Sequence, residues 1–178
     1  MVGDLSRFSK NIKIEVLEQG YVKEFLANNC SWKEDEKFLK EIDLFTLCGP
    51  IHGDFDSSNI VRYNNELRLI DFDNFEPSNI HMFDFISAFC YRGYVQSHLS
   101  TWFDYFRHVL DQWNEMESHK YWKELTRTEK INILYLFVIW RWYKEVLTPK
   151  SNTSDQLIKN ILKEIRELST EDPAVGYR

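Results

Sequence analysis

The sequence predicts a mainly helical α+β protein with a small β-hairpin between its helices. Hydrophobic residues make up 43% of the 178 residues and aromatic residues 16%, which is enough to build a core. Apolar residues recur at helical intervals on both sides of residues 51–73, whereas inside that segment they form two short strand patterns. The length suits one domain, so we expect a single domain over residues 1–178.

Two helices are expected before the hairpin. The first covers about residues 5–28, where apolar residues recur every three or four positions and Gly20 is an internal weak point. The second covers about residues 31–47, and its charged start, KEDEK, is expected to face solvent. Gly49 and Pro50 are expected to end this helix, because proline cannot continue it and glycine permits the turn.

The hairpin itself is predicted from a change of period. Residues 59–63 and 67–71 form the two expected strands. Asn64 and Asn65 form the turn, because asparagine tolerates the positive φ that a tight turn demands.

Only helices are expected from residue 80 onward. They cover about residues 81–96, 98–117, 126–147 and 153–168. The helix that starts at Thr126 is apolar nearly all round, so we expect it to be the buried central helix. Capping-box patterns are formed by Thr126 with Glu129 and by Thr153 with Gln156.

Charge and cysteine content narrow the class of protein. The net charge of −6 disfavours a nucleic-acid partner, because phosphate backbones are bound by clustered lysine and arginine. Cys30, Cys48 and Cys90 are odd in number and show no CxxC spacing, which indicates reduced thiols. The start of the chain lacks a signal-peptide pattern, and the longest apolar run, Ile133–Trp140, is far shorter than the ~20 residues of a membrane-spanning helix. We therefore expect a cytoplasmic protein without a membrane partner.

A spaced set of polar residues lies in and after the hairpin region. It comprises His52, Gly53, Asp54, Asn59, Asp71 and Asp84. The first four give the pattern H-G-D-x-x-x-x-N, and the last aspartate lies within an apolar segment. Phosphoryl transfer needs an acceptor that orients the attacking hydroxyl and oxygen ligands that hold Mg²⁺ against the phosphates. The pattern contains residue types suited to both tasks.

Individual tasks follow from this chemistry. Asp54 is the candidate base, and Asn59 and Asp71 are the candidate metal ligands. Asp73 is a further candidate ligand, because it shares a strand face with Asp71 if the strand continues. The segment Asp56-Ser57-Ser58 is expected only to satisfy turn amides.

The same residues resemble a known family. HGDFDSSN, followed by LIDFD and by FDF at residues 83–85, is similar to the catalytic and metal-binding loops of the aminoglycoside phosphotransferase and choline kinase-like superfamily. Members of that superfamily share the protein-kinase-like fold. The resemblance implies that Asp54 is the catalytic base, Asn59 the second metal ligand and Asp71 the magnesium-binding aspartate.

The resemblance also implies an architecture and an activity. His52 and Asp84 match residues that brace the catalytic loop. The implied fold is the C-terminal lobe alone, with helices in residues 1–50, the catalytic loop and metal-binding hairpin in 51–73, and a helical substrate-binding part in 80–178. The implied activity is an ATP- and Mg²⁺-dependent transfer of phosphate to a small-molecule hydroxyl.

Enzymes of that family also have an N-terminal sheet lobe. That lobe carries a glycine-rich loop over the phosphates and a lysine that pairs with them. The sequence contains no G-x-G-x-x-G, so we expect a longer chain or a partner polypeptide to supply the lobe. The alternative is a non-catalytic kinase-like remnant, or half of a split enzyme, that acts as a binding module. Leu5, Phe8 and Ile12 are then candidates for its exposed apolar face.

Aromatic residues suggest where the acceptor binds. Within the run IWRWYKE, Trp140 and Tyr143 are i, i+3 neighbours, whereas Trp142 falls on a different side of the helix. Such rings suit a cationic acceptor, which they bind by cation–π contact. An amino alcohol, an amino sugar and other sugars stay open as acceptors, and ATP and GTP as donors. A metal-dependent hydrolase is a further alternative, which the single histidine within the motif argues against.

Overall fold

The protein is an α+β chain with small antiparallel sheets, which confirms the predicted class. The computed structural model describes residues 9–28, 33–87, 106–107, 109–113, 125–146 and 155–170. The chain divides into two compact units, one of residues 1–13 and 45–100 and the other of residues 14–44 and 101–178. Among the helices within the described ranges, none is long and apolar enough to cross a membrane.

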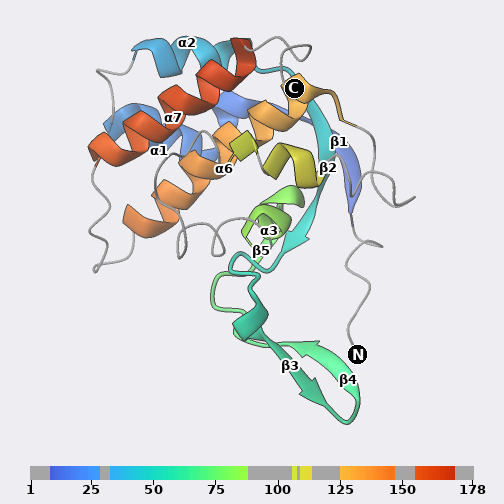
Figure 1. Cartoon of the computed structure of the whole chain (residues 1–178). Helices are drawn as coiled ribbons and strands as arrows, with labels where there is room; N and C mark the ends of the chain where they lie inside the picture. Colours follow the sequence, from blue (N-terminus) through green and yellow to red (C-terminus); the bar gives the residue numbers. More distant parts are fainter. Residues whose placement is uncertain are drawn as a thin grey trace. The chain divides into compact units, whose positions relative to one another are not determined.

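A three-stranded sheet lies largely in the first unit (Figure 1). Strand β2 (Leu44–Ile51) lies between β1 (Lys10–Ile14) and β5 (Glu76–Ile80). Strands β2 and β5 are antiparallel, with Cys48 opposite Ile80. Because β2 ends at Ile51, it leads directly into the H-G-D segment.

Strand β1 corrects the prediction of one helix over residues 5–28. Its sequence, KNIKI, alternates polar residues with β-branched isoleucine, a period that favours a strand. A short 3₁₀ helix, η2 (Val16–Glu18), follows, and helix α1 (Gly20–Asn28) begins only then. Gly20 is therefore the first residue of a helix and not a weak point inside one.

The helix predicted over residues 31–47 is also too long. Helix α2 (Lys33–Glu41) ends well before Leu47, and the following residues belong to β2. Alternate side chains are buried at the start of β2, which is the period of a strand and not of a helix. Gly49 and Pro50 lie at an irregularity in the pairing of β2 with β5, where a residue without an N–H group is tolerated.

The predicted hairpin is confirmed. Strands β3 (Ile60–Tyr63) and β4 (Glu66–Leu69) pair antiparallel, with Tyr63 opposite Glu66. The turn residues Asn64 and Asn65 have φ angles of 49° and 62°, as a type I′ turn requires.

The segment after the hairpin departs from its prediction in one place. Strand β5, with the sequence EPSNI, lacks an apolar period and was not expected, so its pairing with β2 decides its conformation. Helix α3 (Met82–Phe85) lies at the start of the helix predicted over 81–96, and the part of that prediction beyond residue 87 lies outside the described residues. Of the helix predicted over 98–117, residues 106–107 and 109–113 are described, and they are helical.

The second unit is helical in its described parts. Helix α6 (Arg127–Val146) packs against α1 and α7 (Asp155–Thr170), as Figure 1 shows. Every residue from 130 to 140 is buried, which confirms α6 as the buried central helix. Its hydrophobic all-round surface explains this position.

Local capping signals account for where α6 begins. The Thr126 amide donates to Glu129 Oε2 at 2.8 Å, and the Glu129 amide donates to Thr126 Oγ1 at 3.2 Å. This reciprocal pair confirms the first predicted capping box. The second, at Thr153, lies outside the described residues. Helix α7 buries one apolar stripe, formed by Ile158, Ile161, Leu162, Ile165 and Leu168.

One charged residue of α2 is buried against expectation. Asp35, in the KEDEK run, is only 2% exposed, because it lies one turn before the buried Leu39. Its Oδ1 accepts hydrogen bonds from the Tyr135 hydroxyl of α6 and from the Arg166 guanidinium of α7. Burial raises the pKa of Tyr135 far above its ordinary value, and the Asp35 carboxylate adds to this effect. A polar cluster therefore joins α2, α6 and α7.

Candidate active site

The H-G-D loop is held by a carboxylate from helix α3. Asp84 Oδ2 accepts from the His52 amide at 2.6 Å, and its Oδ1 accepts from the Gly53 amide at 2.9 Å. Burial raises the pKa of Asp84, whereas the two amide hydrogen bonds act in the opposite direction. This contact explains why a carboxylate lies in the apolar segment Met82–Phe85: it satisfies two backbone donors that β2 leaves at its end.

Gly53 is required by its conformation and by its surroundings. Its φ of +81° lies in the left-handed region, which disfavours any residue with a side chain. A Cβ atom at this position would also collide with the backbone carbonyl oxygen of Asn74. The loop therefore passes directly against the segment that follows Asp71.

The His52 ring connects the loop to the end of the hairpin. His52 is 1% exposed, and its Nε2 donates to the Ile70 carbonyl at 2.9 Å. A carbonyl only accepts, so Nε2 carries the proton, and the buried Nδ1 has no hydrogen-bond partner among the described residues. The ring also packs on Phe72, with centroids 4.8 Å apart. His52 thus contacts the residues on either side of Asp71.

Asn59 makes the second connection between the same two segments. Its Nδ2 donates to the Asp54 carbonyl at 2.8 Å, and its own carbonyl accepts from the Ile70 amide at 3.0 Å. The side-chain carbonyl oxygen of Asn59 is the group that remains for a ligand. Asn59 ends a 3₁₀ turn, η3 (Ser57–Asn59), which Asp56 caps by accepting from the Ser58 amide at 2.8 Å. That cap confirms the structural task predicted for Asp56, whereas the Ser58 hydroxyl donates to the Asp56 carboxylate at 2.7 Å.

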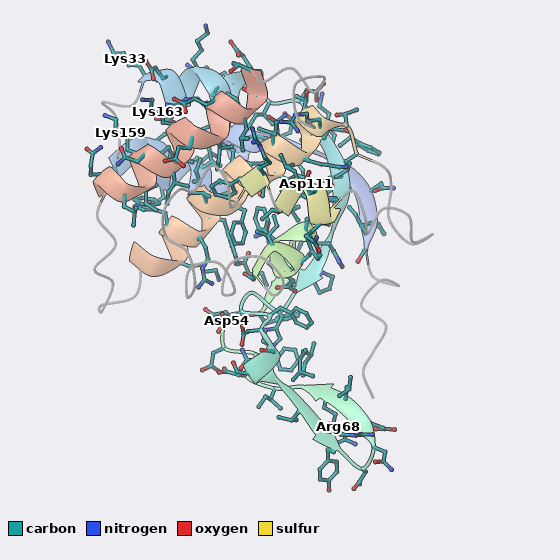
Figure 2. The ribbon with its side chains drawn as sticks, viewed as in Figure 1. Lys33, Asp54, Arg68, Asp111, Lys159 and Lys163 are labelled. Atoms are coloured by element: carbon teal, nitrogen blue, oxygen red, sulfur yellow. The ribbon has the colours of Figure 1, made fainter. Side chains whose placement is uncertain are left out.

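The two candidate metal ligands after β4 are exposed. Asp71 has a φ of +62°, an unusual value for a residue with a side chain. Because β4 ends at Leu69 and residues 73–74 form a turn, strand alternation does not extend to Asp73. The condition for Asp71 and Asp73 to share a strand face, that the strand continues through them, is therefore not met. Asp54 is half-buried in the loop between β2 and η3 (Figure 2).

The donor set determines which metal the segment suits. Within the described residues, no three His, Cys, Asp or Glu side chains come close enough to form a complete metal cage. The available groups near the loop are oxygen donors, namely the Asn59 amide oxygen and the Asp71 carboxylate. Mg²⁺ prefers oxygen and often takes only one or two ligands from protein, leaving the rest to water and phosphate. The donor set is thus compatible with Mg²⁺.

The aromatic residues proposed for the acceptor belong to the second unit. Trp140 and Trp142 are 1% and 3% exposed, so both indoles are core side chains. Trp142 packs edge-on against Phe25, with centroids 5.5 Å apart. Tyr143 is half-buried and is the most exposed member of this set.

A further polar cluster, formed by Ser9 and His81 beside Gly49, was not predicted from the sequence. Gly49 of β2 lies against Ser9 and His81, whose hydroxyl and Nε2 share a short hydrogen bond. Burial lowers the pKa of His81. Burial also raises the pKa of the nearby Cys48 thiol to about 11, so this thiol stays protonated at neutral pH. In the sequence, only the small residue Gly49 indicates this close packing.

Comparisons with known proteins add no assignment. No protein-family model matches the chain, and no curated protein or solved structure matches it. The chemistry of the loop is therefore inferred from its residues and their geometry.

Proposed function

We propose that the chain is an ATP- and Mg²⁺-dependent phosphotransferase acting on a small-molecule hydroxyl, or the catalytic lobe of one. The observation that carries this proposal is the pair of connections between the Asp54 loop and the Asp71 segment. His52 bonds the Ile70 carbonyl, and Asn59 bonds both the Asp54 carbonyl and the Ile70 amide. Phosphoryl transfer depends mainly on positioning the base and the metal ligands together.

Each residue has a proposed task. Asp54 orients the acceptor hydroxyl and takes its proton, while Asn59 and Asp71 hold Mg²⁺, with Asp73 as an additional ligand. ATP supplies the phosphoryl group, and Mg²⁺ neutralises charge on its phosphates when both are bound. Asp84 holds the loop in place through the two amides that it accepts.

The proposal extends to the donor and the acceptor. A sheet lobe with a glycine-rich loop, from a further segment or a partner polypeptide, belongs to the complete enzyme that we propose. The acceptor is an amino alcohol, an amino sugar or another sugar. The net charge of −6 favours a cationic acceptor over an anionic one.

Calorimetric titration of the chain with ATP, with and without Mg²⁺, tests the metal half of the proposal. We expect Mg²⁺-dependent binding that Asp71→Ala abolishes. Glu41→Ala removes an exposed carboxylate on α2 and is the matched control that keeps binding. ATP binding by a folded chain that is indifferent to Mg²⁺ or to Asp71→Ala would contradict the assignment.

A transfer assay tests the base. With an acceptor panel of amino alcohols and sugars, Asp54→Ala is expected to keep ATP binding and lose phosphate transfer. Full transfer by Asp54→Ala would show that another group takes the proton.

A second candidate function is a non-catalytic interaction module. It is favoured by large apolar side chains left exposed in the first unit, such as Tyr63 at 56%, Leu67 at 63% and Phe72 at 48%. Ile12, expected on such a face, is 40% exposed, while Leu5 and Phe8 lie outside the described residues. A folded chain that binds no Mg²⁺-nucleotide but associates through this surface would favour the second function.

A further inference from the structure

Strand β4 has an open edge among the described strands. The β3–β4 sheet has two strands, and in the described part of the chain β4 pairs only with β3. Isolated two-stranded hairpins are marginally stable, and an unpaired strand edge is a template for another strand. At the centre of this edge, Leu67 is 63% exposed.

The alternation of hydrogen-bonded and non-hydrogen-bonded pairs along the hairpin shows which backbone N–H and C=O groups of β4 point outward. The Ile70 amide donates to the Asn59 carbonyl at 3.0 Å, so these two residues form a hydrogen-bonded pair. Hydrogen-bonded and non-hydrogen-bonded pairs alternate along an antiparallel ladder, so Val61 and Arg68 form the next hydrogen-bonded pair. Leu67 falls between such pairs, and its N–H and C=O groups therefore point away from β3.

This alternation allows β4 of one copy to pair with β4 of a second copy across a twofold axis. In an antiparallel arrangement centred on Leu67, the outward N–H and C=O of Leu67 bond the same groups of Leu67 in a second copy. Glu66 then lies opposite Arg68 of the second copy, and Arg68 opposite its Glu66. These are non-hydrogen-bonded pairs, in which Cα atoms approach to about 4.5 Å and opposite charges stabilise the sheet. The strand is therefore self-complementary in charge.

The opposite edge of the hairpin lacks this property. The outward groups of β3 include those of Arg62, which lies opposite Leu67. A twofold pairing of β3 centred on Arg62 would place two arginines directly opposite each other, and like charges in that position destabilise a sheet. The charge pattern thus selects β4 over β3.

We propose that two copies of this chain associate through β4, forming a four-stranded antiparallel sheet in the order β3-β4-β4-β3. Within one copy, Arg68 Nη2 and Glu66 Oε2 lie 3.4 Å apart, with side chains 43% and 64% exposed, so this ion pair is weak. The Arg68 guanidinium also lies 4.7 Å from the centroid of the Tyr63 ring. Figure 2 shows Arg68 on the hairpin. The proposal does not depend on the phosphotransferase activity.

Charge-reversal variants of the full chain test the pairing, with sedimentation velocity as the measurement. Wild type is expected to show a concentration-dependent monomer–dimer equilibrium. Glu66→Arg alone and Arg68→Glu alone place like charges opposite each other, and each is expected to weaken dimerisation by about tenfold or more. A mixture of the two single variants restores both opposite-charge pairs and is expected to form the heterodimer. That recovery cannot come from repair within one hairpin, because each chain keeps two like charges.

A backbone variant separates edge pairing from side-chain contact. Leu67→Pro removes the outward N–H of β4 without touching its ladder with β3, and is expected to abolish the dimer. Arg62→Pro removes the equivalent N–H from β3 and is the matched control, expected to leave dimerisation unchanged. Circular dichroism checks that both variants fold. A wild-type chain that stays monomeric at all accessible concentrations would overturn the proposal, as would failure of the mixed variants to associate.

Discussion

The carboxylate of Asp84 accepts a hydrogen bond from the backbone amide of His52 at 2.6 Å, across 32 positions of sequence. The same carboxylate accepts from Gly53, so one side chain satisfies two donors at the end of β2. Backbone donors that are removed from water and left unpaired cost free energy. The position of the H-G-D loop therefore depends on this aspartate.

Asp84→Ala is expected to lower the free energy of unfolding by about 2–4 kcal/mol, because it leaves the two amides without their acceptor. Chemical denaturation measures the loss. Asp73→Ala removes an exposed carboxylate from a turn nearby and is expected to change stability by less than about 0.5 kcal/mol. Equal effects of the two substitutions would show that Asp84 does not support the loop. Asp84→Asn keeps the shape and one acceptor oxygen, so its loss should be intermediate.

Gly53→Ala is expected to destabilise the protein by about 2 kcal/mol or more, because it adds a Cβ to a residue at φ +81° and directs that atom at the Asn74 carbonyl. Thermal unfolding of the purified variant measures the effect. Gly20→Ala is the matched control: a Cβ there meets nothing within 4 Å, and alanine is the better helix former. It should be neutral or stabilising by up to about 1 kcal/mol. A Gly53→Ala variant as stable as Gly20→Ala would contradict the loop geometry.

The elements that the sequence predicted well carry local signals. The Asn64-Asn65 turn and the capping box before α6 each involve neighbours in sequence. The three-stranded sheet was missed because pairing between distant strands decides it. KNIKI and the start of β2 continue longer stretches in which apolar residues recur at helical intervals, although KNIKI itself alternates like a strand, and β5 has no apolar period at all. Long-range pairing resolved that ambiguity in favour of strands.

In the candidate site, too, side-chain patterns could be predicted from the sequence, whereas long-range backbone contacts could not. The spacing of its polar residues marked the H-G-D loop and the aspartates, because side-chain types are visible in a sequence. The Ile70 carbonyl and the Asn74 carbonyl, against which His52 and Gly53 pack, are backbone groups without any residue signature. The burial of Asp35 was missed for a related reason: its ion-pair partner, Arg166, lies 131 positions away.

Arg166→Met is expected to cost about 3–5 kcal/mol, because it leaves the Asp35 carboxylate buried without its cation. The methionine keeps most of the apolar stem, so the loss reports the charge and not the packing. Lys163→Met removes an exposed partner of Glu167 on the same helix and should cost less than about 1 kcal/mol. Urea denaturation of both variants provides the comparison. The double variant Asp35→Leu/Arg166→Met should recover part of the loss, since it removes the buried charge as well.

His81 is expected to make the stability of the protein sensitive to mild acid. Burial lowers its pKa below the ordinary value of 6.5, so the unfolded chain takes up a proton at a higher pH than the folded chain does. Between those two pKa values the unfolded state binds more protons, and the free energy of unfolding therefore falls as the pH is lowered from 6.5.

Denaturation midpoints measured between about pH 5 and pH 7 check this expectation. The decline should be present in wild type and absent from His81→Gln, whose amide does not titrate. Asp84 contributes with the opposite sign, because its raised pKa makes the folded state the better proton acceptor above pH 3.8. Measuring Asp84→Asn/His81→Gln beside the single variant separates the two groups. An unchanged acid slope in His81→Gln would mean that another group senses the pH.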